Sequence, residues 1–434
     1  MAIGRYGRET SALDAGQPGM CDSFLKYVES LFGDVWLRSN DAHRLQDLWQ
    51  RKDHLATCEL FALGRAISVL DKLHGDWLRT TSNKIKKQPI NAHGFISEIL
   101  VCASIRAPGG NVVPATGNRA GYDSEVKYSD GVNHVVSIKN HDITMHEATF
   151  QRHCKKLKNV FVAKVKEIRV HGGLRVVSNV YLDEGLFDAL ISFVGNELLE
   201  FGTYELGNAV AVVFCDVSDE CSASSTYSSE LVVVSPYHRN EMLNQEDKLM
   251  KAAKNLKKHM PRSTSYFRWV WMRLHASING DALCVAARKM LALGIDAGFD
   301  GIIVCQPAVV RTQRLSVIHS SIVIIRDEAH WENTGFNEGK DLALELLVGG
   351  GGSEFSKLYM ANGTSEPQAY PVNHYLYQDS DYYVKMKLDD SGGYSGEIRA
   401  PASGARFHLV YECEQGSFAF GSKLTPYHDE LLIF

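Results

Sequence analysis

The 434-residue sequence has no stretch of 18 or more consecutive apolar residues, so no transmembrane helix is expected. Its nine cysteines include no C-x-x-C pair, so the pattern signals neither a disulfide framework nor a zinc knuckle. No internal repeat is visible, and residues 1–20 have no apolar core of the kind a secretory signal needs. These observations favour a protein of the reducing cytoplasm.

The composition is that of an ordinary globular chain, with 45% hydrophobic and 22% charged residues, and the length suffices for two or three domains. The net charge of −5 is unevenly distributed. Residues 84–175 contain fifteen Lys or Arg and seven Asp or Glu, a local balance of +8, so the remaining residues sum to −13. A basic segment in an acidic chain indicates a site for a polyanion, or else a solvated basic face.

Hydrophobic periodicity predicts an α/β fold. Apolar residues at three- and four-residue spacing predict helices between residues 22 and 82, which Thr80 to Asn83 are expected to end. Further helices are expected at 91–105, 144–158, 244–260 and 281–295, and strands at 159–165, 174–182, 208–217, 230–238, 265–275, 300–308 and 320–327. The predicted organisation is a helical N-terminal region (1–83), an α/β domain (84–330), a connecting helix (331–348), a linker that begins with four glycines (349–364) and a β-rich C-terminal domain (365–434).

Residues 121–142 predict a β-hairpin with strands near 121–128 and 133–139 and a turn at Ser129 to Gly131. If the strands pair around that turn, Asp123 approaches the end of the second strand, where Lys139 follows an apolar run. Residues two apart on a strand share a face, so Asp123 and Glu125 are expected to point the same way. Glu98, on the preceding predicted helix, could add a second carboxylate.

Carboxylates beside a lysine suit the hydrolysis of a phosphodiester. Mg²⁺ prefers one or two carboxylates together with waters and phosphate oxygens. It lowers the pKa of a bound water and offsets charge in the transition state. The lysine can orient that water or stabilise the developing negative charge.

The order of Glu98, Asp123 and Ser137-Ile138-Lys139, separated by 25, 14 and 2 residues, resembles the PD-(D/E)xK nuclease superfamily. The resemblance covers roughly residues 90–165. It implies a restriction-endonuclease-like mixed-sheet core running helix, about three strands, helix, strand, and places that nuclease-like core in the 84–330 domain. It also implies that Asp123 binds metal, that Lys139 is the catalytic lysine and that Glu98 is the helix acid.

The resemblance implies Mg²⁺ or Mn²⁺ as cofactor, with the Ile138 carbonyl as an additional ligand. The sequence departs from the family at Ser137, where an Asp or Glu is usual. Either Glu125 or Glu98 supplies the missing carboxylate, or the site is inactive.

The resemblance further implies a Mg²⁺-dependent endonuclease that acts on DNA more readily than on RNA, in restriction or antiviral defence, with homo-oligomerisation left open and no membrane partner. The residues proposed to contact the phosphate backbone are Lys127, Lys155, Lys156, Lys248, Lys251 and Lys254. Two alternatives remain: an inactive nucleic-acid-binding protein on the same fold, and an interaction protein whose basic face meets an acidic partner. The residues from Trp331 onward, with fifteen acids against seven bases, could be that partner.

Overall fold

The computed structural model describes most of the chain, and its residues form two compact units. The described residues are 5–8, 13, 18–39, 43–52, 54–107, 109–116, 121–129, 133–216, 227, 229–263, 266–275, 278–292, 296–311, 315–325, 343–352, 357–360, 368–369, 373–379, 383–388, 394–399, 406–413, 416–423 and 431–434. Unit 1 comprises residues 1–142, 244–355 and 430–434, and unit 2 comprises 143–243 and 356–429. No helix in the described part of the chain is long and apolar enough to cross a membrane.

Unit 1 is built on a seven-stranded mixed sheet in the order β13-β11-β10-β9-β4-β3-β2. Its strands are β2 (Gly110–Pro114), β3 (Ser124–Tyr128), β4 (Asn133–His141), β9 (Tyr266–Leu274), β10 (Gly301–Arg311), β11 (Leu315–Ile325) and β13 (Gly350–Gly352). β2, β3 and β4 form an antiparallel meander, whereas β4, β9 and β10 run parallel to one another. A separate short pair joins β1 (Ile105–Arg106) to β12 (Ala343–Leu344).

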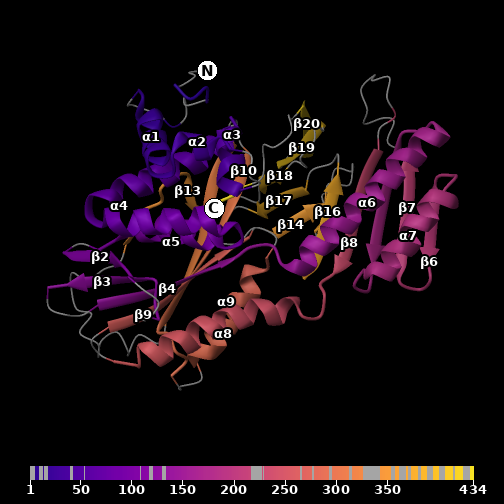
Figure 1. Cartoon of the computed structure of the whole chain (residues 1–434). Helices are drawn as coiled ribbons and strands as arrows, with labels where there is room; N and C mark the ends of the chain where they lie inside the picture. The colour runs from indigo at the N-terminus through magenta and orange to yellow at the C-terminus, as the bar shows by residue number, and fades with distance from the viewer. Residues whose placement is uncertain are drawn as a thin grey trace. The chain divides into compact units, whose positions relative to one another are not determined.

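Helices cover both faces of this sheet, which makes a three-layer α/β/α arrangement (Figure 1). One layer contains α1 (Met20–Phe32), α2 (Asp34–Leu37), α3 (Arg44–Gln50), α4 (His54–Lys87), the 3₁₀ turn η1 (Pro89–Asn91) and α5 (Ala92–Ser104). The other layer contains α8 (Glu241–His259), which begins in unit 2, and α9 (Gly280–Ala292).

The alternation of side chains along β9 separates the two cores. Trp269 and Trp271 pack with α4 and α5, and Val270 and Met272 pack with α8 and α9. This is the period-two pattern of a strand buried on both faces. The predicted strand at 265–275 is therefore confirmed, and its tryptophans are core residues.

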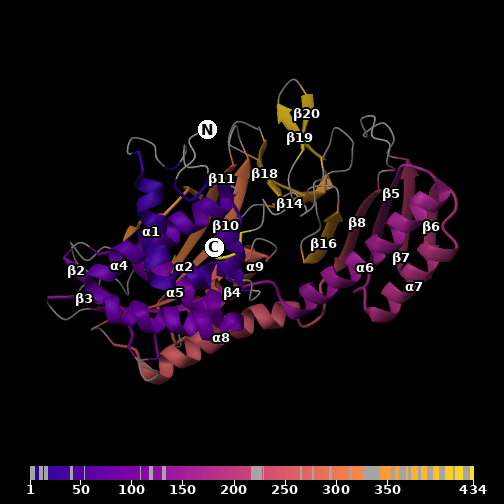
Figure 2. The same cartoon turned by 45° about the horizontal axis from the view of Figure 1, so that its top comes forward.

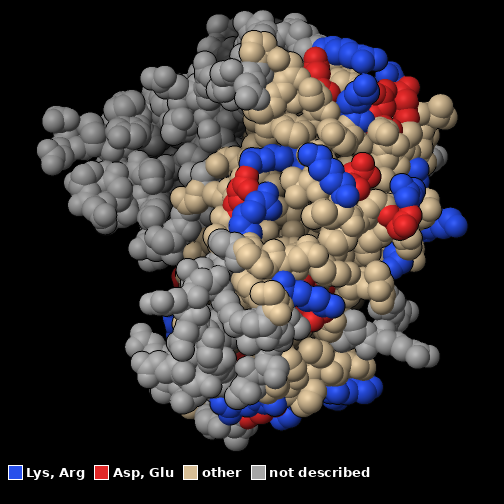
Figure 3. Space-filling model, turned by 90° about the vertical axis from the view of Figure 1, so that its left-hand side faces the viewer, with Lys and Arg blue, Asp and Glu red and all other residues tan. Residues whose placement is uncertain are grey.

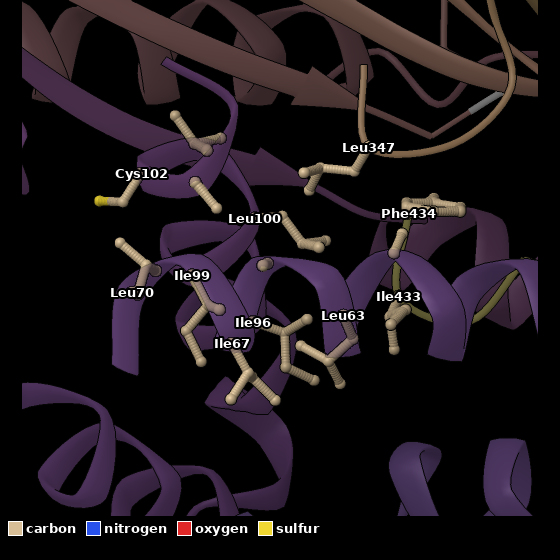
Figure 4. Close-up of a cluster of buried hydrophobic side chains, with 14 of the residues drawn as sticks. Leu63, Ile67, Leu70, Ile96, Ile99, Leu100, Cys102, Leu347, Ile433 and Phe434 are labelled. Atoms are coloured by element: carbon tan, nitrogen blue, oxygen red, sulfur yellow. The ribbon is translucent and has the colours of Figure 1, made fainter. Parts of the chain in front are cut away.

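A close helix crossing explains a glycine in the middle of α4. A Cβ atom added at Gly64 would clash with the backbone carbonyl of Phe24 on α1. Helix-interior glycine costs stability relative to alanine, but here it lets α1 lie directly against α4. Figure 4 shows Leu63, Ile67 and other apolar side chains of α4 and α5 packed into the core beside them.

The last described residues, 431–434, belong to the core of unit 1. Glu59 on α4 is fully buried, and its carboxylate accepts the backbone N–H groups of Leu432, Ile433 and Phe434, with Ile433 N 2.5 Å from Oε2. Burial raises the pKa of Glu59 to about 7 despite these hydrogen bonds. A buried acid therefore fixes the end of this segment against α4.

Unit 2 contains a five-stranded sheet in the order β16-β8-β5-β7-β6 and two helices, α6 (Met145–Ile168) and α7 (Glu184–Asn196). Both helices share one buried cluster with strands of the sheet (Figure 2). Its strands are β5 (Gly172–Ser178), β6 (Gly202–Leu206), β7 (Val210–Asp216), β8 (Ser229–Pro236) and β16 (His374–Asp379). The unit also holds β14 (Lys357–Met360), β15 (Gln368–Ala369), β17 (Tyr383–Leu388), β18 (Tyr394–Arg399), β19 (Arg406–Cys413) and β20 (Gly416–Lys423).

Two of the predicted local elements are wrong. α4 does not end at Thr80 to Asn83 but continues to Lys87, because Thr81 and Ser82 are buried in the helix layer. The predicted strand at 159–165 is the second half of α6, where Phe161 and Val165 continue the buried face of that helix. In both places tertiary packing overrides a local signal.

The units also divide the chain differently from the predicted domains. The helical region 1–83 shares its core with the sheet, and residues 143–243 of the predicted 84–330 domain form part of unit 2. Residues 343–344 are a strand and not the end of a helix, while 331–342 lie outside the described residues. Gly350–Gly352, predicted as linker, pairs with β11. The C-terminal region is rich in strands as expected, but β16 completes the sheet of unit 2.

A buried ion pair in unit 1 gives a test of its stability. Arg268 is fully buried, with Nε 3.0 Å from Asp300 Oδ2 and Nη2 2.8 Å from Asp296 Oδ1. We expect Asp300→Ala to destabilise the protein by about 3–5 kcal/mol, because it leaves a buried guanidinium with half of its partners. Urea unfolding measures the effect. Asp247→Ala, which removes the exposed partner of Lys251, serves as control and is expected to cost less than about 1 kcal/mol. Equal effects of the two variants would contradict this role for Asp300.

Candidate active site

Asp123 is held by the backbone at the point where β3 begins. It lies in a bend directly before that strand. Its N–H donates to the Val136 carbonyl of β4 (2.8 Å), and its own carbonyl accepts from the N–H of Ala115, just after β2 (3.0 Å). The position of Asp123 is thus fixed from both neighbouring strands, and its side chain need not follow the alternation of β3.

The Asp123 carboxylate faces the end of β4, as the sequence predicts. Its Oδ2 accepts from the Ile138 backbone N–H (2.5 Å), the Ser137 hydroxyl (3.3 Å) and the Lys139 ammonium (3.3 Å). The Lys139 ammonium also donates to the Ile138 carbonyl at 3.0 Å. Charge-assisted hydrogen bonds of this kind orient the Asp123 carboxylate.

Glu98 joins this group from α5. Its side chain is half-buried, and burial followed by the negative charge of Asp123 raises the pKa of its carboxyl to about 8, although Lys139 and Lys84 act in the opposite direction. Burial also raises the pKa of the Cys102 thiol, and the negative charges of Glu98 and Asp123 add to the effect. Glu98 therefore lies within electrostatic range of Asp123 and Lys139, where α5 packs beside β4.

The structure brings together Asp123, Ser137, Ile138, Lys139 and Glu98, but it gives Glu125 other partners. Glu125 accepts from the Tyr122 hydroxyl (3.2 Å) and pairs with Lys127 on the same strand (3.3 Å). The expectation that Asp123 and Glu125 point the same way rests on strand alternation. It does not apply here because Asp123 precedes the strand.

The donor chemistry of this site fits one hard divalent cation with few protein ligands. Among the residues that the structure describes, no group of three or more His, Cys, Asp or Glu side chains could hold a metal ion. The carboxylates of Glu98 and Asp123 remain, and Mg²⁺ commonly uses one or two carboxylates and keeps waters in its other positions. Burial and the neighbouring charge of Asp123 raise the pKa of Glu98 even though Lys139 and Lys84 oppose them, and a cation between the two acids would offset the repulsion.

The lysines proposed for phosphate contact fall into different surroundings. Lys248 is half-buried, and its ammonium donates to the Asn140 carbonyl (3.1 Å) and lies 3.3 Å from His141 Nδ1. It supports the end of β4 and is a poor candidate for phosphate contact. Lys127, Lys251 and Lys254 are exposed in unit 1, and Lys155 and Lys156 are exposed on α6 of unit 2.

The basic segment 84–175 is divided between the two units, with residues 84–142 in unit 1 and residues 143–175 in unit 2. Figure 3 shows one face of the molecule on which Lys and Arg side chains lie in small groups, most of them beside Asp or Glu. On this face, within the described residues, charges of the two signs are interspersed. The charge balance along the chain therefore overstates the local positive field.

Sequence reasoning missed a polar network directly after β4. Asp142 lies 2.5 Å from Arg44 Nη2 of α3 and 3.1 Å from His93 Nδ1 of α5. Burial lowers the pKa of His93 to about 4, so its ring is neutral at pH 7 and Arg44 supplies the positive charge beside Asp142. The polar run Asn140-His141-Asp142 after an apolar strand was the available signal.

Comparison of the chain with protein-family models, with curated proteins and with solved structures found no match.

The raised pKa of Glu98 predicts a specific pH dependence of stability. Unfolding lets Glu98 return to its usual pKa of 4.5, whereas in the folded protein the pKa is about 8. Between these values the folded state holds the proton and the unfolded state releases it, so stability falls as pH rises from 4.5 to 8. We expect Glu98→Gln to lose this part of the pH dependence.

Urea-unfolding midpoints at several pH values between 4.5 and 9 measure the effect. Glu125→Gln is the matched control, because the Glu125 carboxylate accepts from the Tyr122 hydroxyl and pairs with Lys127. Its profile should parallel that of the wild type. A Glu98→Gln profile that also parallels the wild type would show that Glu98 does not titrate in this way.

Proposed function

We propose that the chain is a metal-dependent nuclease of the PD-(D/E)xK type that hydrolyses phosphodiester bonds of DNA. The observation that carries the proposal is the contact between Lys139 and Asp123 at 3.3 Å, with Glu98 close enough for Asp123 to raise its pKa. Glu98 comes from a helix, Asp123 from the bend before β3 and Lys139 from β4. An acid with a perturbed pKa beside a second acid and a lysine is typical of catalytic sites.

The arrangement of unit 1 supports the same proposal. Apart from β1, which belongs to the separate pair with β12, the chain runs α5, β2, β3, β4, then α8 and β9 after residues 143–240. This is the order helix, three strands, helix, strand that the resemblance implies. β9 lies parallel to β4 and next to it. Asp123 lies at the start of β3 and Lys139 lies near the end of β4, the neighbouring strand on which α5 packs.

Each residue has a distinct role in the proposed reaction. Asp123 and Glu98 would hold Mg²⁺ or Mn²⁺, with the Ile138 carbonyl as a further oxygen ligand. The ion would lower the pKa of a bound water and neutralise charge on the phosphate. Lys139 would orient the attacking water or stabilise the negative charge that develops on the phosphate oxygens. Ser137 and the Ile138 N–H keep the Asp123 carboxylate oriented.

A second candidate function is a nucleic-acid-binding protein without catalysis. Ser137 stands where the family usually has a carboxylate, and its hydroxyl donates to Asp123 at 3.3 Å from a fully buried position. This candidate predicts DNA binding without metal-dependent cleavage. Restriction or antiviral defence as the biological setting, and a cytoplasmic location, follow from the resemblance and the cysteine pattern alone.

Plasmid cleavage with purified protein tests the proposed reaction. We expect cutting in Mg²⁺ or Mn²⁺ and none in EDTA. Asp123→Asn, Lys139→Met and Glu98→Gln should each reduce the rate at least about a hundredfold, because each removes a metal ligand or the catalytic ammonium. Glu125→Gln should cut at nearly the wild-type rate, since Glu125 contacts Tyr122 and Lys127 instead. An Asp123→Asn protein as active as the wild type would refute the site. A wild-type protein that binds DNA but never cuts it would favour the second candidate.

Salt dependence of DNA binding separates exposed lysines from structural ones. Lys251→Gln and Lys254→Gln should each lower the slope of log K against log salt by up to about 0.9 if that lysine meets a phosphate, with an unchanged melting temperature. Lys248→Gln should lower the melting temperature, because it removes the hydrogen bond to the Asn140 carbonyl. Fluorescence anisotropy at several salt concentrations and thermal melts measure both quantities. A salt-independent affinity would exclude phosphate contact by these lysines.

A further inference from the structure

Unit 1 contains a second site, a cavity of about 230 Å³ between α5 and the sheet. Leu100 and Val101 of α5 form one side, Trp271 and Cys305 of β9 and β10 form another, and Leu347 and Phe434 close it. Figure 4 shows Leu100, Leu347 and Phe434 around this region. The cavity is larger than an engineered apolar cavity of about 150 Å³ that binds benzene.

Arg273, a charged side chain in the lining of the cavity, has fewer hydrogen-bond partners than donors. Arg273 of β9 is only 7% exposed. Within the described residues its hydrogen bond runs from Nη1 to Asn140 Oδ1 (3.2 Å), and its buried Nε has no hydrogen-bond partner. A guanidinium carries five N–H donors, and a buried charge without full pairing is costly.

The acids near Arg273 are already engaged by other groups. Asp142 contacts Arg44 and His93, and Glu59 accepts the backbone N–H groups of residues 432–434. Glu345, the acid that lines the cavity itself, is paired with Arg65 and with Arg106, the latter at 2.5 Å. An anion entering the cavity would therefore meet the Arg273 guanidinium and would face an acid whose charge is already balanced.

We propose that this cavity is a binding site for a small amphipathic carboxylate, whose apolar body fills the space between α5 and the sheet and whose carboxylate pairs with Arg273. Burial of the ligand's apolar part against the apolar side chains of the cavity is favourable. The guanidinium favours a carboxylate over a neutral group of the same shape, because charge-assisted hydrogen bonds are the stronger ones. The site is separate from Asp123 and Lys139 and does not depend on the proposed nuclease activity.

Isothermal titration with benzoate and with its neutral analogue benzamide tests the charge requirement, with phenylacetate and hexanoate as further carboxylates. We expect benzoate to bind the full-length protein at least about tenfold more tightly than benzamide, since hydrogen bonds to charged groups exceed neutral ones by about that factor. Trp271 lines the cavity, so carboxylate binding should also change tryptophan fluorescence, and Trp271→Phe should remove most of that change while the heat of binding remains.

Two variants locate the binding. Arg273→Met should weaken benzoate binding about 10–100-fold and leave benzamide binding nearly unchanged. Val101→Phe keeps Arg273 and fills the cavity, so it should weaken the binding of both benzoate and benzamide. It tests the location of the site even if Arg273→Met does not fold. The matched controls are Arg79→Met and Val285→Phe, at exposed positions on α4 and α9, which should bind as the wild type does. Equal affinity for benzoate and benzamide, unaltered binding by Val101→Phe, or no binding of any of the three carboxylates up to about 10 mM would overturn the proposal.

Discussion

The parallel pairing of β4 with β9 is the constraint on which unit 1 depends. Nine residue pairs join the two strands, from Asn133 opposite Tyr266 to His141 opposite Leu274. Parallel strands cannot be joined by a tight turn and need a long crossover, and here the crossover includes residues 143–243 of unit 2 as well as α8. The helix layers bury both faces of β4, and the pairing with β9 fixes the position of that strand in the sheet. It thereby sets the position of Lys139 relative to Asp123 on the neighbouring meander.

Buried charge is treated in two different ways in the same unit. Arg268 is fully compensated by Asp296 and Asp300, so nothing is gained there by binding another ion. Glu98 and Arg273 are less fully compensated. Burial and the charge of Asp123 raise the pKa of the Glu98 carboxyl even though Lys139 and Lys84 oppose them, and the Arg273 guanidinium has a buried donor without an acceptor. A buried charged group without enough partners raises the free energy of the folded protein. Binding an oppositely charged ligand lowers it again, because the ligand supplies the missing partner. The cation expected near Glu98 and the anion expected near Arg273 follow from the same argument with opposite signs.

The parts of the structure that depend on short-range pattern were predictable from the sequence. The hairpin and the approach of Asp123 to Lys139 follow from strand pairing over a few residues, and Glu98 was placed by the family order. Parts that depend on packing between distant segments were not predictable. The strand-like run 159–165 is helical because the core of unit 2 needs Phe161 and Val165 on one face, and Gly350–Gly352 has no side-chain pattern to reveal its pairing with β11. The cavity beside Arg273 arises only when α5, β9 and residues 431–434 are assembled.

The binding of residues 432–434 by Glu59 has a consequence for how the chain folds during synthesis. These partners are 373 to 375 residues apart, which corresponds to roughly 20–75 s of translation at about 5–20 residues per second. Throughout that interval α4 has emerged, but the Glu59 carboxyl has no backbone amides to accept from, and the apolar surface later covered by Ile433 and Phe434 stays open. Unit 1 is therefore completed only after all of unit 2 has been made. Between the synthesis of α4 and that of residues 431–434, the nascent chain therefore carries an uncovered apolar surface.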